Sequence, residues 1–320
     1  MTIVVGITPE ERGRGALHLA AMLARSTGDD LLLCTVVPVS WPAGPAWVDA
    51  EYRAHLTRTA SEALDEARAR LPADTTAASL VHEARSAPAG LMEVAAEHDA
   101  ALVVVGSCST GVLGRVALGS VTDRLVHSSA VPVALPPRGY RCGAGSRVTR
   151  VTAAYGGTDE ANDLVVAAAG VAARMGATLR LASFVVRSRP MYTAGVGREA
   201  EVAMVEQWVQ EIEAAGRATL DRVSGLAAPP PALEAVVGYG ESWDEALEDV
   251  EWGDGDVLVV GSSSAGPLAR VFLGSRASKI VRHSPVPVVV VPRGAAAELA
   301  DEAVEAREAR PQATNRIEEA

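Results

Sequence analysis

Apolar residues in the first half of the chain form short runs that are separated by longer segments with helical spacing. The runs predict strands at 2–7, 30–37, 76–82, 101–106 and 131–135. After the first run, Ala16, Leu19, Ala20 and Leu23 recur at the i, i+3, i+4, i+7 spacing of an amphipathic helix. Strands that alternate with helices indicate βαβ units, so we expect an α/β fold with a parallel sheet covered by helices on both faces.

The same pattern of apolar runs recurs in the second half of the chain. Corresponding apolar runs occupy 147–155, 178–186, 233–237, 257–261 and 286–291. Val-Val-Gly-Ser occurs at 104–107 and again at 259–262, and sliding the chain by that offset also aligns Leu-Gly-Ser and Val-Pro-Val. The chain is therefore a tandem duplication.

Each copy predicts one five-stranded domain. We expect a first domain at 1–140, a glycine-containing linker at 141–146 and a second domain at 147–294. Residues 295–320 form an acidic tail rich in Ala and Glu, with few large apolar side chains, and we expect it to be frayed, partly helical and outside the core.

The fifth run of each copy contains a proline, Pro132 or Pro287. Because proline has no N–H to donate to a ladder on both sides, these runs predict edge strands. Two such edges on one chain could pair with each other, so we expect an internal pseudo-dimer through the fifth strands.

Composition narrows the classes of function. The net charge of −11, from 29 basic and 40 acidic residues, argues against nucleic acid as a partner, and no apolar stretch is long enough to predict a membrane span. The acidic run from Glu241 to Asp256 suggests a solvated face. Three cysteines without Cys-x-x-Cys spacing favour the reducing cytoplasm, and the scattered histidines predict no metal site.

The loop after the fourth run is the strongest chemical signal. Both copies read Gly-Ser-x-Ser-x-Gly-x-Leu-x-Arg-Val-x-Leu-Gly-Ser. Glycines let a backbone approach an anion, and the N–H groups that follow Gly119 and Gly274 would face it at the start of a helix. A glycine loop with helix-capping serines would look similar without any ligand, so the residues leave both interpretations open.

The five-strand unit, this loop spacing and the Val-Pro-Val strands resemble the universal stress proteins in their tandem form. The resemblance implies a Rossmann-like, adenine nucleotide alpha hydrolase-like fold with strand order 3-2-1-4-5, and a loop that binds the phosphates of ATP or AMP. The nucleotide-binding residues that it implies are Thr8, Val36, Gly106, Ser109, Gly119 and Ser120 in the first copy, and Gly156, Val185, Gly261, Ser264, Gly274 and Ser275 in the second.

Both copies depart from the family pattern. Ser109 and Ser264 replace the second loop glycine, and Thr8 and Gly156 stand where binding members carry an aspartate. Thr8 also fits a helix N-cap, because Thr8-Pro9-Glu10-Glu11 is a capping box. Val36 and Val185 fit equally as core strand residues.

The resemblance implies a regulatory, stress-response role with weak binding of ATP or AMP. No carboxylate, lysine or histidine is placed beside the loop to drive hydrolysis, so we expect no catalytic residue and at most a slow ATPase. The alternative is an interaction module of the same fold that binds a protein partner and no nucleotide.

Overall fold

The computed structural model describes residues 1–8, 14–39, 46–72, 74–186, 198–262 and 273–308. The chain forms two compact units, and neither is one continuous stretch of sequence. The first unit joins Met1–Val148 to Ser262–Pro292, and the second joins Thr149–Gly261 to Arg293–Ala320.

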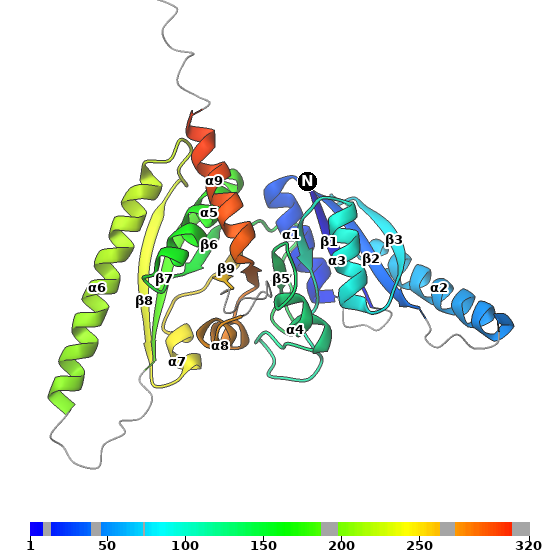
Figure 1. Ribbon diagram of the computed structural model, residues 1–320, viewed down its shortest axis with the longest axis horizontal. Coiled ribbons are helices and arrows are strands. Elements are labelled where there is room, and N and C mark those ends of the chain that lie inside the picture. Colours follow the sequence, from blue (N-terminus) through cyan, green and yellow to red (C-terminus); the bar gives the residue numbers. More distant parts are fainter. Residues whose placement is uncertain (9–13, 40–45, 73, 187–197, 263–272, 309–320) are drawn as a thin grey trace, which may run out of the picture. The chain divides into compact units, whose positions relative to one another are not determined.

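The first unit is a mostly parallel sheet with helices packed on it (Figure 1). Its strands follow the order β3-β2-β1-β4-β5-β10; the first five are parallel and β10 is antiparallel to β5. The order within the first copy is the one that the family resemblance implied. Its elements are β1 (Thr2–Gly6), α1 (Arg14–Thr27), β2 (Asp30–Pro38), α2 (Ala46–Ala69), β3 (Ala77–Ala84), α3 (Ala87–Glu97), β4 (Ala100–Val104), α4 (Ser120–Val126), β5 (Val133–Leu135), α8 (Ser275–His283) and β10 (Val288–Val291).

The fifth runs of the two copies lie side by side in this unit. Val288 pairs with Leu135, and Val290 pairs with Val133. Pro132 and Pro287 each precede their strand, so neither ladder needs a proline N–H. The Pro132 carbonyl accepts a hydrogen bond from the amide of Val103 at 3.0 Å, which ties the start of β5 to β4.

The second unit has a parallel sheet in the order β9-β6-β7-β8. Its elements are β6 (Arg150–Ala154), α5 (Asp159–Met175), β7 (Thr178–Val186), α6 (Arg198–Ser224), β8 (Leu233–Gly240), α7 (Trp243–Glu248), β9 (Asp256–Gly261) and α9 (Arg293–Glu308).

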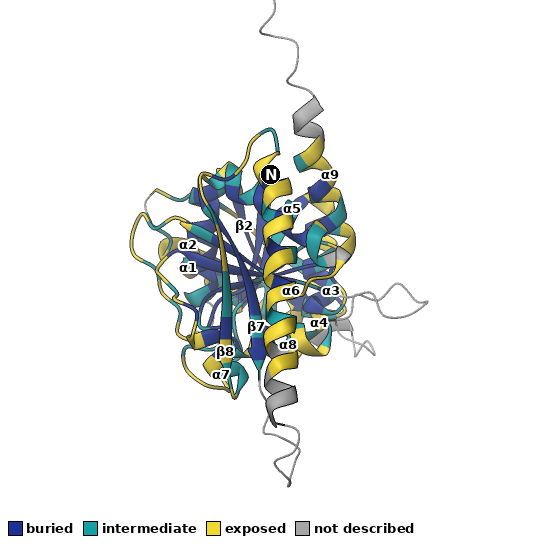
Figure 2. Ribbon diagram, turned by 90° about the vertical axis from the view of Figure 1, so that its left-hand side faces the viewer, coloured by how far each residue is buried: buried dark blue, intermediate teal, exposed yellow. Residues whose placement is uncertain are grey.

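The apolar runs form the core of each sheet. Val4, Val5 and Val104 in the first unit, and Leu179 and Leu258 in the second, have no exposed surface. Parallel strands covered on both faces require such continuous apolar runs. Figure 2 shows buried strands between helices, and α6 exposing its outer side. None of the described helices is long and apolar enough to cross a membrane.

The acidic tail differs from the sequence expectation. Residues 293–308 form α9, which packs along α5 and buries Ala296 and Ala300. A Cβ placed on Gly170 of α5 would lie 3.0 Å from the Cβ of Ala303. The expectation of an unpacked segment was wrong for α9, because small side chains let two helices approach closely without large apolar residues.

Candidate functional site

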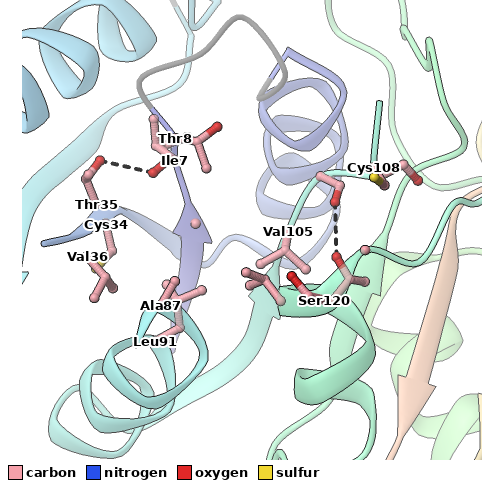
Figure 3. A pocket seen from close by; sticks show the side chains of 16 residues that line it. Ile7, Thr8, Cys34, Thr35, Val36, Ala87, Leu91, Val105, Cys108 and Ser120 are labelled. Carbon is pink, nitrogen blue, oxygen red and sulfur yellow. Dashed lines mark hydrogen bonds between the residues drawn. The ribbon is translucent and has the colours of Figure 1, made fainter. Parts of the chain in front are cut away.

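A cavity of about 270 Å³ lies at the carboxyl ends of β1, β2 and β4 in the first unit. Its walls come from the residues that follow β1, the second half of β2, the start of α3, and the loop that leads from β4 into α4 (Figure 3). Open α/β sheets bind their ligands at this position, in the crevice beyond the carboxyl ends of the strands.

Gly6, the last residue of β1, leaves space for two side chains that line the cavity. A Cβ on Gly6 would lie 3.0 Å from Val105 Cγ1 and 3.1 Å from Leu91 Cδ1. A side chain here would push Val105 or Leu91, both of which line the cavity. The sheet therefore ends in a position that only a glycine fills without displacing the wall.

The edge of β2 presents main-chain groups to the cavity. The Ile7 amide donates to the Cys34 carbonyl at 2.8 Å, and the Thr35 hydroxyl donates to the Ile7 carbonyl at 3.2 Å (Figure 3). Since backbone groups alternate between the two edges of a strand, the amide and carbonyl of Val36 point to the same edge as those of Cys34. At Val36 the neighbouring strand β1 has already ended, so this edge faces the cavity.

The loop after β4 is closed by main-chain bonds rather than left open. Gly114 N donates to the Arg138 carbonyl at 3.0 Å, and Arg138 N donates to the Arg115 carbonyl at 2.8 Å. The Ser107 hydroxyl donates to the Pro136 carbonyl at 2.5 Å and accepts from the Ala117 amide at 3.1 Å. These bonds hold both ends of the loop against the segment that follows β5.

The start of α4 forms the second polar wall. Gly119 occupies the N-cap position in an extended conformation and gives no side-chain cap, and the Thr122 hydroxyl donates to the Gly106 carbonyl at 3.3 Å. A Cβ on Gly119 would lie 3.2 Å from the Cβ of Cys108. The first-turn amides of a helix have no intrahelical acceptor, so the main chain at 119–122 offers donors along this wall.

The first-copy candidates separate into two groups. The cavity is lined by Thr8, Val36, Gly106, Gly119 and Ser120, whereas Ser109 is exposed outside the lining. The residues Pro9 to Glu11 of the capping box lie outside the described residues, so the N-cap role of Thr8 stays a prediction. Sequence reasoning missed Ala87 and Leu91 of α3, because small and apolar residues on a helix carry no chemical signal.

The second-copy candidates are divided between the units. Gly156, Val185 and Gly261 belong to the second unit, Gly274 and Ser275 to the first, and Ser264 lies outside the described residues. Neither unit therefore contains all of the described second-copy candidates.

Hydrogen bonds in the second unit correct the alignment of the two copies by one residue. Tyr155 N donates to the Ala182 carbonyl at 2.8 Å, and the Ser183 hydroxyl donates to the Tyr155 carbonyl at 3.0 Å. These bonds repeat those of Ile7, Cys34 and Thr35, so Phe184 is the counterpart of Val36. Val185 is buried, as is Val37 of the first copy.

The cysteine thiols differ in their surroundings. Cys34 is buried, and desolvation raises its pKa to about 12. Burial also raises the pKa of the half-buried Cys142, whose thiol donates to the His18 carbonyl at 3.3 Å. Cys108 lines the cavity, with its Sγ 3.2 Å from Thr110 Oγ1. Among the described residues, no group of three His, Cys, Asp or Glu side chains is arranged to hold a metal ion.

The sequence matches the Universal stress protein family twice, at residues 1–136 and 147–292. The chain belongs to this family. It is 42% identical over 298 residues to a universal stress protein of Mycobacterium tuberculosis, a match that covers 91% of this chain and all of that protein.

A solved structure with the same domain order supports the fold. A universal stress protein from Archaeoglobus fulgidus matches with a TM-score of 0.62 and 19% identity, covering 92% of this chain and 98% of that one. A shorter universal stress protein from Archaeoglobus fulgidus, in complex with dAMP, covers 42% of this chain with a TM-score of 0.32.

Proposed function

We propose that this universal stress protein is a cytoplasmic, regulatory stress-response protein that binds an adenine nucleotide, ATP or AMP, in the cavity of its first copy. The observation that carries the proposal is one cavity that joins the free edge of β2 to the first turn of α4. Family membership adds to the argument, because the loop that forms one wall is the loop whose pattern resembles the nucleotide-binding members.

The β2 edge suits the base. The Val36 amide and carbonyl supply one donor and one acceptor side by side, which matches the donor and acceptor along the edge of adenine. Leu91 and Val105, both buried, give the neighbouring apolar surface against which a planar ring would pack. Binding pockets commonly combine such apolar walls with a few placed polar groups.

The start of α4 suits the phosphate. Main-chain amides at a helix N-terminus attract anions, and the glycine at position 119 lets a phosphate approach without meeting a side chain. Thr8 stands at the mouth in place of a carboxylate, so the ribose hydroxyls gain a weaker acceptor than an ionised group would give. We therefore propose a Kd of about 1 μM or weaker.

The cavity supports binding rather than efficient turnover. The described residues that line it carry no ionised side chain that could act as a general base. We propose that any hydrolysis of ATP is slow, and that the bound nucleotide reports the energy state of the cell.

Calorimetric titration with AMP and with ATP tests the proposal, and Cys108 gives an independent signal. Bound nucleotide should slow the alkylation of Cys108 by N-ethylmaleimide, while Cys142 supplies the unprotected reference on the same chain. Mass spectrometry of small molecules released by acid from freshly purified protein identifies any ligand carried through. No titration heat and no protection of Cys108 would reject nucleotide binding at this cavity.

One observation favours the alternative role as a protein-interaction module. Val112 and Leu113 lie next to each other in the loop after β4, and each is 71% exposed. Adjacent apolar side chains at a loop tip are suited to contact another protein. If the unmodified protein binds neither AMP nor ATP, this loop becomes the first candidate for its function.

A further inference from the structure

The two copies can be compared residue by residue from hydrogen bonds that recur in each unit. The bonds of Ile7 and Thr35 recur at Tyr155 and Ser183. The N-cap of α3, where Ser86 accepts from the Ala89 amide, recurs in α7, where Ser242 accepts from the Glu245 amide. Each position of the first-copy cavity on β1, β2 and α3 thus has an assigned counterpart.

Three counterparts carry much larger side chains. Ile7 is replaced by Tyr155, Val36 by Phe184, and Ala87, at the first position of α3, by Trp243 of α7. The last change puts an indole where the first copy has a methyl group. Aromatic side chains each bury large areas, so the rings of Phe184 and Trp243 remove volume from the place that the cavity occupies in the first copy.

Tyr155 is held inside the second unit by a polar network. Its side chain is buried, and its hydroxyl lies 3.2 Å from Thr219 Oγ1 and 3.4 Å from Asn162 Oδ1. Thr219 also donates to Asn162 Oδ1 at 2.9 Å. Because α5 and α6 each contribute one partner, the ring is fixed on the face of the sheet that these helices cover, and not on the face that α7 covers.

The helix that carries Trp243 is pulled tightly onto its neighbouring strand. A Cβ on Gly238 of β8 would lie 2.1 Å from the Ala246 carbonyl oxygen, and one on Gly240 would lie 2.4 Å from the Ala246 amide nitrogen. The first-copy counterparts of these glycines are His82 and Ala84, and there Gly90 of α3 makes the close approach, since a Cβ on it would lie 2.9 Å from Ala84 Cβ. Helix α7 also has 6 residues where α3 has 11.

Three other exchanges replace a larger side chain of the first copy by a smaller one in the second. The space that they free is less than the space that the aromatic rings fill. Cys34, Thr35 and Thr8 correspond to Ala182, Ser183 and Gly156. The first two exchanges remove a single heavy atom each, and the third removes a short side chain that is exposed in the first copy. The indole of Trp243 and the phenyl ring of Phe184 outweigh these losses.

We infer that one chain binds one adenine nucleotide, in the first copy, and that the second copy has filled its counterpart of the cavity with its own aromatic side chains. The inference rests on the proposed function, and it makes that function asymmetric. The first copy holds the ligand, while the second copy contributes strand β10 and a fold that is closed to this ligand.

The test exchanges the decisive side chain between the copies. Ala87→Trp brings the second-copy residue into the first-copy cavity, and Trp243→Ala is the matched control in the second copy. Calorimetry with AMP as the probe measures stoichiometry and affinity, and circular dichroism checks the fold. Gly119→Val is a second blocking variant, since Gly119 has an extended backbone that valine readily adopts.

The expected result is one AMP per unmodified chain, at least a tenfold loss of affinity in Ala87→Trp and in Gly119→Val, and unchanged binding in Trp243→Ala. Two AMP per chain, or a loss confined to Trp243→Ala, would overturn the inference and leave the proposed function standing. Absence of AMP and ATP binding in the unmodified protein would overturn the proposed function itself.

Discussion

The two units place opposite chemistry at the amino ends of equivalent strands. In the second unit, Arg180 and Asp256 are 4% and 2% exposed and lie in one charged cluster with Arg150. The first-unit counterparts of Arg180 and Asp256 are Leu32 and Ala101. One sheet therefore closes this end with ionised groups, and the other closes it with apolar side chains.

The cluster satisfies most of its own charges. Arg150 donates from Nε and Nη2 to the two carboxylate oxygens of Asp256, at 3.0 and 2.7 Å. Arg180 donates to Thr152 Oγ1 and to the Glu251 carbonyl, and its guanidinium lies 4.7 Å from the centre of the Trp252 ring. Desolvation lowers the pKa of Arg180, whereas the bonds to Asp256 raise the pKa of Arg150.

The first unit forms an equivalent parallel sheet without such ions. A buried ion pair often adds little net stability, because desolvation offsets the attraction between its members. What the cluster does hold is the segment 251–256, whose Glu251 carbonyl and Gly253 amide both bond to it. Removing one member, however, leaves a charged partner without its counter-ion, above all the buried Arg180.

The largest effect is expected from Asp256→Ala, which removes the carboxylate at the centre of the charged cluster. The substitution leaves Arg150 and Arg180 without their carboxylate, and we expect the free energy of unfolding to fall by about 3–5 kcal/mol. Urea unfolding followed by circular dichroism measures the loss. A change below about 1 kcal/mol would mean that the carboxylate contributes little in its buried position.

Replacing the whole charged cluster by the first-unit side chains should lower the free energy of unfolding far less than removing Asp256 alone. The fourfold variant Arg150→Thr, Thr152→Val, Arg180→Leu and Asp256→Ala installs the first-unit side chains, and we expect unchanged stability or a gain of about 1–4 kcal/mol. Hydrogen exchange at 251–256 should nonetheless increase, because the bonds to Glu251 and Gly253 are lost. A fourfold variant as unstable as Asp256→Ala would show that the ions are required in this unit.

The units also differ in what packs on their first helix, α1 or α5, and Gly170→Met tests that difference. Gly170 faces Ala303 of α9, while its first-unit counterpart, Met22, accepts a hydrogen bond from the Tyr140 hydroxyl at 3.4 Å. The larger side chain should displace α9 and cost about 1–3 kcal/mol. Faster proteolysis within 293–308 would report the displacement, with Gly170→Ala as the milder control.

Among the single substitutions, the smallest effect is expected from Trp252→Leu. The substitution removes the ring beneath Arg180 and the indole bond to the Leu247 carbonyl at 2.6 Å, and we expect a loss of about 1–2 kcal/mol in urea. Trp252→Phe keeps a ring and should recover part of it. Equal losses in both variants would assign the effect to the indole N–H alone.

Apolar patterning was sufficient to predict the strands and the duplication, because parallel strands covered on both faces require uninterrupted apolar runs such as 101–106. The glycines of the loop likewise marked Gly106 and Gly119 as cavity residues. The offset of 155 residues holds for that loop, whereas the hydrogen-bonded counterparts at the ends of the first two strands, Ile7 with Tyr155 and Cys34 with Ala182, are 148 residues apart. The pairing of Val36 with Val185 that the resemblance implied is therefore one residue off, since an offset of 148 matches Val36 to Phe184.

Burial of charged and small residues could not be predicted from composition. Asp256 ends an acidic run that suggests a solvated face, yet it is enclosed by two arginines that are distant in sequence. The alanines of α9 suggest weak burial, and only the glycine on α5 explains how they pack. In both cases the decisive partner lies in another element, which local pattern does not show.

The pairing of β5 with β10 has a consequence for synthesis on the ribosome. β5 ends at Leu135, and its antiparallel neighbour begins at Val288, so 288 minus 135, or 153, residues must be added before the two can meet. At ordinary translation rates this takes about 8–30 s. Throughout that interval the nascent chain presents an unpaired edge of Val133, Ala134 and Leu135, the kind of edge that invites pairing with a neighbouring nascent chain. Pro132 beside a strand of only three residues keeps that exposed edge short.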